Sequence, residues 1–221
     1  MKPSKIILVF LIFLSVYSIA LVISEMAISR DFARYFFTDI TNPALLDSTI
    51  SIDSNLFKGF LVRLFGINTT LCMLLLWTCS VLFACQLFIS DMKRVKSFAI
   101  IQMLLFGYLA LDERFLIHEL LGIIVRINDA FILLIIGSVE LIVLFCWRDI
   151  WQKAKFSGIF LILASFFFFI MVLIDAFIHS GSLPRLAAED LSKTWACFCL
   201  LFFSITVFIN QIGIKNEEKA V

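Results

Sequence analysis

The fold class follows from a stretch without a single charge, LFGINTTLCMLLLWTCSVLFACQLFIS, which covers residues 64–90. A helix of roughly 20 residues, rising about 1.5 Å per residue, crosses the apolar core of a bilayer, so this stretch is long enough to span it. The rest of the chain has the same character, since 62% of its 221 residues are hydrophobic and only 16% are charged. Such a composition indicates an integral membrane protein rather than a soluble domain.

Further apolar runs flank this stretch, at residues 6–23, 97–118, 130–147, 156–178 and 194–214. The sequence therefore predicts an all-α, polytopic bundle of six transmembrane helices, forming one integral membrane domain over residues 1–221. The first run is laid out like a signal peptide, but its length favours an uncleaved first helix. The expected location of the protein is an inner or plasma membrane of the bacterial type. The polar segment 25–60 is predicted to lie outside, either as a solvated loop or as a cap or docking segment.

The orientation is predicted from two short basic hinges, residues 91–96 and 147–155, which lie directly at the ends of apolar runs. Lys and Arg in short loops are retained on the cytoplasmic side, so both hinges and both termini are placed inside. The formal net charge of +1 offers no basic face for nucleic acid, which excludes that partner class. The expected partners are the lipid bilayer and, in one alternative, another membrane protein.

A polar island interrupts the third apolar run at residues 111–120, and it holds Asp112, Arg114, His118 and Glu119. Charges at membrane depth are expensive, so a cluster of them is a hypothesis for a functional site. Sixteen residues beyond Lys96, at about 1.5 Å each, Asp112 falls in the outer half of the membrane. On a continuous helix Asp112, Phe115, His118 and Glu119 share one arc that faces the outer side.

A second group is expected at the same outer face, because Asp175 and His179 end the fifth run at an i, i+4 spacing and Lys193 precedes the sixth. Imidazole and carboxylate ligands suit zinc. We therefore predict a divalent metal held by His118, Asp175 and His179, with Asp112, Glu119 and Arg114 as the catalytic groups. The alternative is an interfacial helix end whose charges pair locally.

Glu140 lies ten residues into the fourth run, near the bilayer midplane. A lone carboxylate there is unfavourable. We expect it either to be protonated and hydrogen-bonded to Gln102, Asn68 or Thr78 of another helix, or to belong to a proton or ion path. Polar residues of the second run, such as Asn68, are expected to hydrogen-bond a neighbouring helix.

The acidic stretch with His118-Glu119 and the later Asp175-x-x-x-His179 resembles the membrane hydrolase superfamily that contains alkaline ceramidases. Members of that superfamily have seven spans and a zinc site of three histidines with an acidic and a serine partner. This chain has two histidines and six expected spans, so no residue role is transferred from the resemblance.

Three functions are consistent with these patterns. The first is a metal-assisted hydrolase acting on a lipid or lipid-linked substrate at the outer interface. The second is a small transporter or ion-pathway protein that uses Glu140 and the outer acidic cluster as successive stations. The third is an accessory or structural subunit of a membrane complex, docked through segment 25–60 and the Phe-rich spans.

Overall fold

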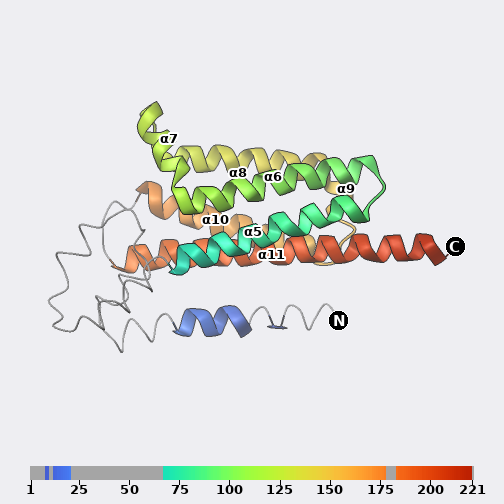
Figure 1. The fold of residues 1–221 in the computed structure, drawn as a ribbon. Coiled ribbons are helices and arrows are strands. Elements are labelled where there is room, and N and C mark those ends of the chain that lie inside the picture. Colours follow the sequence, from blue (N-terminus) through green and yellow to red (C-terminus); the bar gives the residue numbers. More distant parts are fainter. Residues whose placement is uncertain (1–7, 10–11, 21–66, 178–182, 221) are drawn as a thin grey trace, which may run out of the picture.

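The computed structural model describes residues 8–9, 12–20, 67–177 and 183–220, and this part of the chain contains helices and no strand. The all-α prediction is confirmed (Figure 1). A first helix covers residues 12–20. The labelled helices are α5 (Ile67–Ile89), α6 (Lys93–Phe115), α7 (Ile117–Val125), α8 (Asp129–Cys146), α9 (Arg148–Trp151), α10 (Ser157–Phe177) and α11 (Leu183–Ala220).

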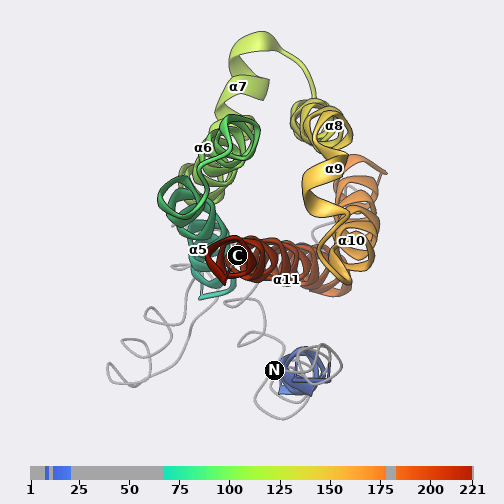
Figure 2. The ribbon, with the colours of Figure 1, turned by 90° about the vertical axis from the view of Figure 1, so that its right-hand side faces the viewer.

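The long helices form an open ring when viewed along their axes (Figure 2). Around the ring they follow the order α6, α5, α11, α10 and α8, and α7 bridges from α6 back toward α8 at one end. Helix α5 packs closely on α6 and on α11, and α11 packs closely on α10, whereas α8 packs more loosely on α7 and α10. The ring therefore has a tightly packed side and a loosely packed side.

Aromatic side chains hold the tight side together. The Phe83 ring of α5 stacks on Phe106 of α6 with centroids 5.7 Å apart, and it meets Phe98 edge-on. Phe203 of α11 lies against the same ring, and all four rings are fully or almost fully buried. Because lipid removes the usual hydrophobic drive between helices, such close packing is what brings these three together.

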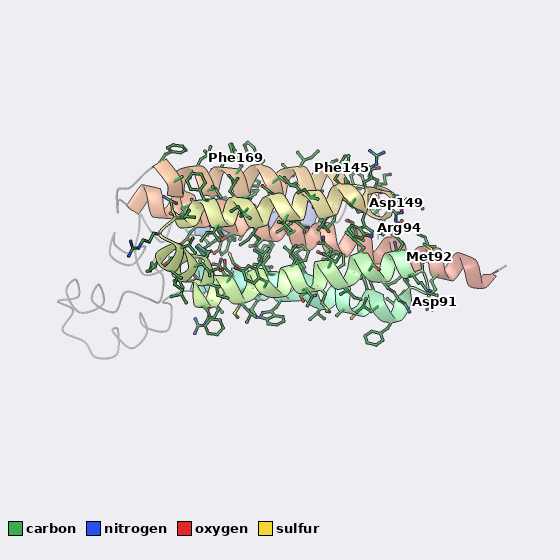
Figure 3. The ribbon with its side chains drawn as sticks, turned by 90° about the horizontal axis from the view of Figure 1, so that it is seen from above. Asp91, Met92, Arg94, Phe145, Asp149 and Phe169 are labelled. Carbon is green, nitrogen blue, oxygen red and sulfur yellow. The ribbon has the colours of Figure 1, made fainter. Side chains whose placement is uncertain are left out.

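Four of the described helices are long and apolar enough to cross a membrane: they lie in α5, α6, α10 and α11. Helices α7 and α8 pass the same test only as a pair, bent by 117° at their break. Large apolar side chains cover the outside, for example Phe88, Ile162 and Phe145, which points away from the bundle in Figure 3. The structure is thus compatible with insertion into a bilayer and with contact to lipid.

The predicted spans 64–90 and 156–178 agree with α5 and α10 to within a few residues. The predicted span 97–118 is wrong at its end, because α6 stops at Phe115 and a separate helix follows. The last span lies inside the longer α11. Segment 25–60 and parts of the first run lie outside the described residues, so six spans and the orientation stay predictions.

Candidate functional site

A break in the chain at Leu116 shapes the site. Leu116 adopts a left-handed conformation, with φ 49° and ψ 48°, and its N–H donates to the carbonyl oxygen of Asp112 at 2.7 Å. A branched residue in this region of backbone space is strained by about 1–3 kcal/mol and persists where its surroundings hold it. The predicted arc through Phe115 is therefore wrong, and the Phe115 side chain is 67% exposed.

Asp112 and His118 nevertheless meet, and they meet because of the break. Asp112 Oδ1 accepts the backbone N–H of His118 at 2.7 Å, and Oδ2 lies 2.8 Å from Nδ1 of the His118 ring. The buried carboxylate thus sits at the beginning of α7, where a negative charge and an acceptor for an unpaired N–H are both favourable. It also fixes the ring, so in the neutral imidazole the proton lies on Nδ1 and Nε2 is the basic nitrogen.

An ion pair from α11 completes this end of the bundle. Lys193 Nζ lies 2.8 Å from Glu113 Oε1 of α6 and 3.4 Å from Asp190 Oδ1 of its own helix. The Lys193 side chain is only 18% exposed, so these contacts are less screened than ion pairs at an open surface. Lys193 was expected at the same face as the polar island, and its contact with Glu113 brings the two together.

A buried polar network is joined to the same ion pair through Asp190. Thr194 donates to Asn68 Oδ1 at 2.7 Å, Asn68 Nδ2 donates to the carbonyl oxygen of Asp190, and Tyr17 also donates to Asn68 Oδ1. The expectation that Asn68 bonds a neighbouring helix is confirmed. This network ties the helix 12–20, α5 and α11 together and holds Asp190 and Lys193 in place.

Two cavities open inside the ring. The first, here called the polar cavity, has a volume of about 110 Å³ and is bounded by the side chains that form the charged end of the bundle. Its polar wall comes from α6, α7 and α11, namely Asp112, Glu113, His118, Glu119, Glu189 and Lys193. Its remaining wall is apolar and includes Leu116, Leu133 and Met171. The site therefore collects groups from segments that are far apart in the sequence.

The second, here called the apolar cavity, has a volume of about 170 Å³ and lies between α6, α8, α10 and α11. Its wall is almost wholly apolar, with Gly137, Ser165 and Leu144 among its members. Three residues, Leu109, Phe168 and Leu200, line both cavities. The two spaces therefore adjoin, and together they run from the charged end toward the middle of the bundle.

Glu140 of α8 lines the apolar cavity, and Gln102 Nε2 of α6 donates to its Oε2 at 3.1 Å. This confirms the expectation that Glu140 finds a polar partner on another helix, with Gln102 as that partner. Gln102 is fully buried. The pair joins α6 to α8 across the loosely packed side of the ring.

The remaining predicted site residues are placed as follows. Arg114 is exposed on α6 and does not line the polar cavity. Asp175 belongs to α10, its side chain is not described, and His179 lies outside the described residues. Among the described side chains no group of three or more His, Cys, Asp or Glu is arranged to hold a metal ion. The metal set of His118, Asp175 and His179 therefore stays a prediction.

Sequence reasoning assigned no role to Glu113, which lies in the polar island of residues 111–120. A signal was present, because Lys193 is the single basic residue between Arg185 and Lys215. A lysine near membrane depth needs a carboxylate, and Glu113 is an acidic residue at a matching depth on another span.

Comparisons with known proteins give one match. A family model described as a domain of unknown function, DUF8692, matches residues 11–207. No curated protein matches the chain, and no solved structure does.

Proposed function

The chain belongs to the DUF8692 family, a domain of unknown function, and from this starting point we propose that it is a multi-pass membrane protein that takes a lipid-like molecule into its two adjoining cavities. One observation carries the proposal: a charged cavity and an apolar cavity share the wall formed by Leu109, Phe168 and Leu200. A molecule with a polar head and a hydrocarbon chain matches both, since binding sites are mostly apolar with a few convergent polar groups.

The proposed topology has six spans, with both termini on the cytoplasmic side of the membrane and the polar cavity at its outer face. It is supported by the position of the basic hinges, because Asp91, Met92, Arg94 and Asp149 gather at one end of the bundle (Figure 3). Arg94 donates to Asp149 at 2.9 Å, which ties the two hinges together. The basic end would face the cytoplasm, so the Asp112 end would face outward.

The proposed chemistry is a metal-assisted hydrolysis at the head group of the bound lipid. Asp112 orients His118 through Nδ1, which aims the Nε2 lone pair away from the carboxylate, as in histidines that bind zinc. His118, Asp175 and His179 would hold a divalent metal, which lowers the pKa of a bound water and polarises the bond to be cleaved. Glu119 lines the same cavity and is the proposed acid or base, and exposed Arg114 is the proposed contact for an anionic head group.

A second candidate is supported by the position of Glu140. Its carboxyl group lines the apolar cavity, which adjoins the polar cavity with its acidic wall. The two would then be successive stations of a proton or ion path, and the protein would be a small transporter. Replacement of Glu140 by Gln would abolish proton or ion transport in that case, as measured by ion flux into proteoliposomes.

Filling the apolar cavity tests the main proposal. Ser165 and Ile162 lie on the same helix, α10; Ser165 lines the cavity, and the Ile162 side chain is 70% exposed on the outside. Native mass spectrometry in mild detergent should find bound lipid on the wild type and on Ile162→Trp, and none on Ser165→Trp. Equal lipid retention by all three proteins, at equal thermal stability, would contradict the proposal.

The metal step has its own test. Elemental analysis of the purified protein should find a stoichiometric divalent metal, which is lost in His118→Ala and in His179→Ala. Fatty acid or head-group release from a panel of membrane lipids should fall in the same two variants. Metal-free protein that still cleaves lipid would contradict the metal step. His118, oriented by Asp112, would then be the general base that activates water.

A further inference from the structure

The side of the ring between α6 and α8 is bridged at two places. At the basic end Arg94 of α6 donates to Asp149 and to the carbonyl oxygen of Cys146. Near the middle Gln102 Nε2 donates to Glu140 Oε2 at 3.1 Å. Figure 2 shows α6 and α8 standing apart on this side, with α7 spanning between them. The hydrogen bond between Gln102 and Glu140 therefore contributes much of the attraction that holds α8 to α6 beside the apolar cavity.

Two oxygen atoms of this bridge have no partner. Within the described residues, Gln102 Oε1 and Glu140 Oε1 are both buried and neither takes part in a hydrogen bond. An ionised Glu140 would leave both as unsatisfied acceptors, which is unfavourable away from water. A protonated Glu140 carries an O–H donor, and the carbonyl oxygen of Gln102 is an acceptor in need of one.

We propose that Glu140 binds a proton and forms a neutral, reciprocal acid–amide pair with Gln102, and that this pair closes the apolar cavity between α6 and α8. In the pair, the Gln102 N–H donates to the Glu140 carbonyl oxygen, and the Glu140 O–H donates to the Gln102 carbonyl oxygen. Loss of the proton leaves two acceptors facing each other and a charge in the cavity wall. The remaining N–H bond from Gln102 does not offset the cost of a charge in this apolar wall, so Glu140 moves toward water and α8 moves away from α6.

The surroundings make Glu140 the group that titrates. Of the described residues that line the apolar cavity, from α6, α8, α10 and α11, only Glu140 is ionisable. The charged groups next along this side are Arg94 and Asp149 at the basic end and the Asp112–His118 pair at the other end. Arg94 and Asp149 are both more than half exposed, so the solvent screens their effect.

Helix α8 is free to respond because its other attachments are few. It packs loosely on α7 and α10. Gly137 lies so near the Phe168 ring of α10 that an added Cβ would come within 2.9 Å of it, so α8 and α10 approach closely at this point. The inference supplies an entrance for the lipid-like molecule of the proposed function, but the proton site and the movement do not depend on that molecule.

Infrared spectroscopy of the full chain in lipid tests the proton site. The wild type at neutral pH should show a carboxylic acid band that is absent from Glu140→Gln, a neutral variant that can still exchange two hydrogen bonds with Gln102. In Gln102→Leu the band should persist at a shifted frequency, because the acid remains but its acceptor is gone. A wild type without this band would overturn the proposal.

Spin labels on α6 and α8 test the movement. Leu104 and Val139 are both exposed on the outside, and cysteines placed there report the distance between the two helices by pulsed electron resonance. The wild-type distance should lengthen from mildly acidic to alkaline buffer, whereas Glu140→Gln should stay short throughout. Asp149→Asn should behave as the wild type. A wild-type distance that is independent of pH, or an equal change in Glu140→Gln, would overturn the inference even if lipid uptake is confirmed.

Discussion

Helices α5 and α8 are held in the same bundle by different kinds of contact. Helix α5 is clasped between α6 and α11, with Phe83 at the centre of an aromatic cluster and Asn68 in a buried polar network. Helix α8 turns large side chains such as Phe145 outward and is joined to α6 by the polar pair Gln102 and Glu140. The tight side provides the scaffold, and the cavities lie where the packing loosens.

The largest effect should come from the centre of the tight side. Phe83→Ala removes a fully buried ring that three other rings contact, so we expect a loss of about 3–5 kcal/mol in unfolding free energy. Phe145→Ala on α8, whose side chain is 70% exposed, should change it by less than about 0.5 kcal/mol. Thermal unfolding in detergent gives both values, and similar losses would erase the contrast between the two helices.

The ion pair at the charged end should come next. Lys193→Met leaves Glu113 and Asp190 with less compensation, and we expect a loss of about 2–3 kcal/mol, below the range for fully buried pairs. The double variant Lys193→Met with Glu113→Gln should regain at least half of this loss, because it also removes the carboxylate charge that Lys193 pairs with. If the loss of unfolding free energy in the double variant equals the sum of the losses in Lys193→Met and Glu113→Gln, the two residues are not coupled.

A smaller effect is expected at the start of α7. Asp112→Asn keeps the shape of the side chain but weakens its bonds to the His118 N–H and ring, at a cost of about 1 kcal/mol. Hydrogen exchange should accelerate in α7 and stay unchanged in α5. Arg114→Ala, at an exposed position two residues on, is the matched control. Unchanged exchange in α7 would mean that the carboxylate does not hold this helix.

The smallest effect concerns Leu116 itself. Its φ of 49° suits Gly better than any branched residue, so Leu116→Gly should be more stable than Leu116→Ala by about 1 kcal/mol. Both variants lose the apolar contact of the Leu116 side chain with the polar cavity, so their difference is the backbone strain relieved by Gly minus the extra unfolded-state entropy of Gly. Equal unfolding free energies would show that the break is not strained.

The sequence was sufficient for the features that rest on composition and depth. Residues 64–90 are uncharged and long enough to span, so α5 was predictable. Glu140 at mid-depth needs a polar partner, so a bond to Gln102, Asn68 or Thr78 was predictable, and the structure selects Gln102. The break at Leu116 was not, because neither Gly nor Pro stands there and the chain reads as one continuous helix. The hydrogen bonds between Asp112 and His118 were not predictable either, because they form only when the chain turns at the end of α6.

The central claim is that a lipid-like molecule occupies the adjoining cavities, with its head at Asp112 and His118 and its chain between α8 and α10. The most direct test is photo-crosslinking in liposomes with a phospholipid that carries a diazirine at the end of one chain. The label is predicted on peptides that contain Gly137 and Ser165, and it should be lost in Ser165→Trp. Labelling confined to outward residues such as Phe145 and Ile162, and unchanged in that variant, would contradict the claim.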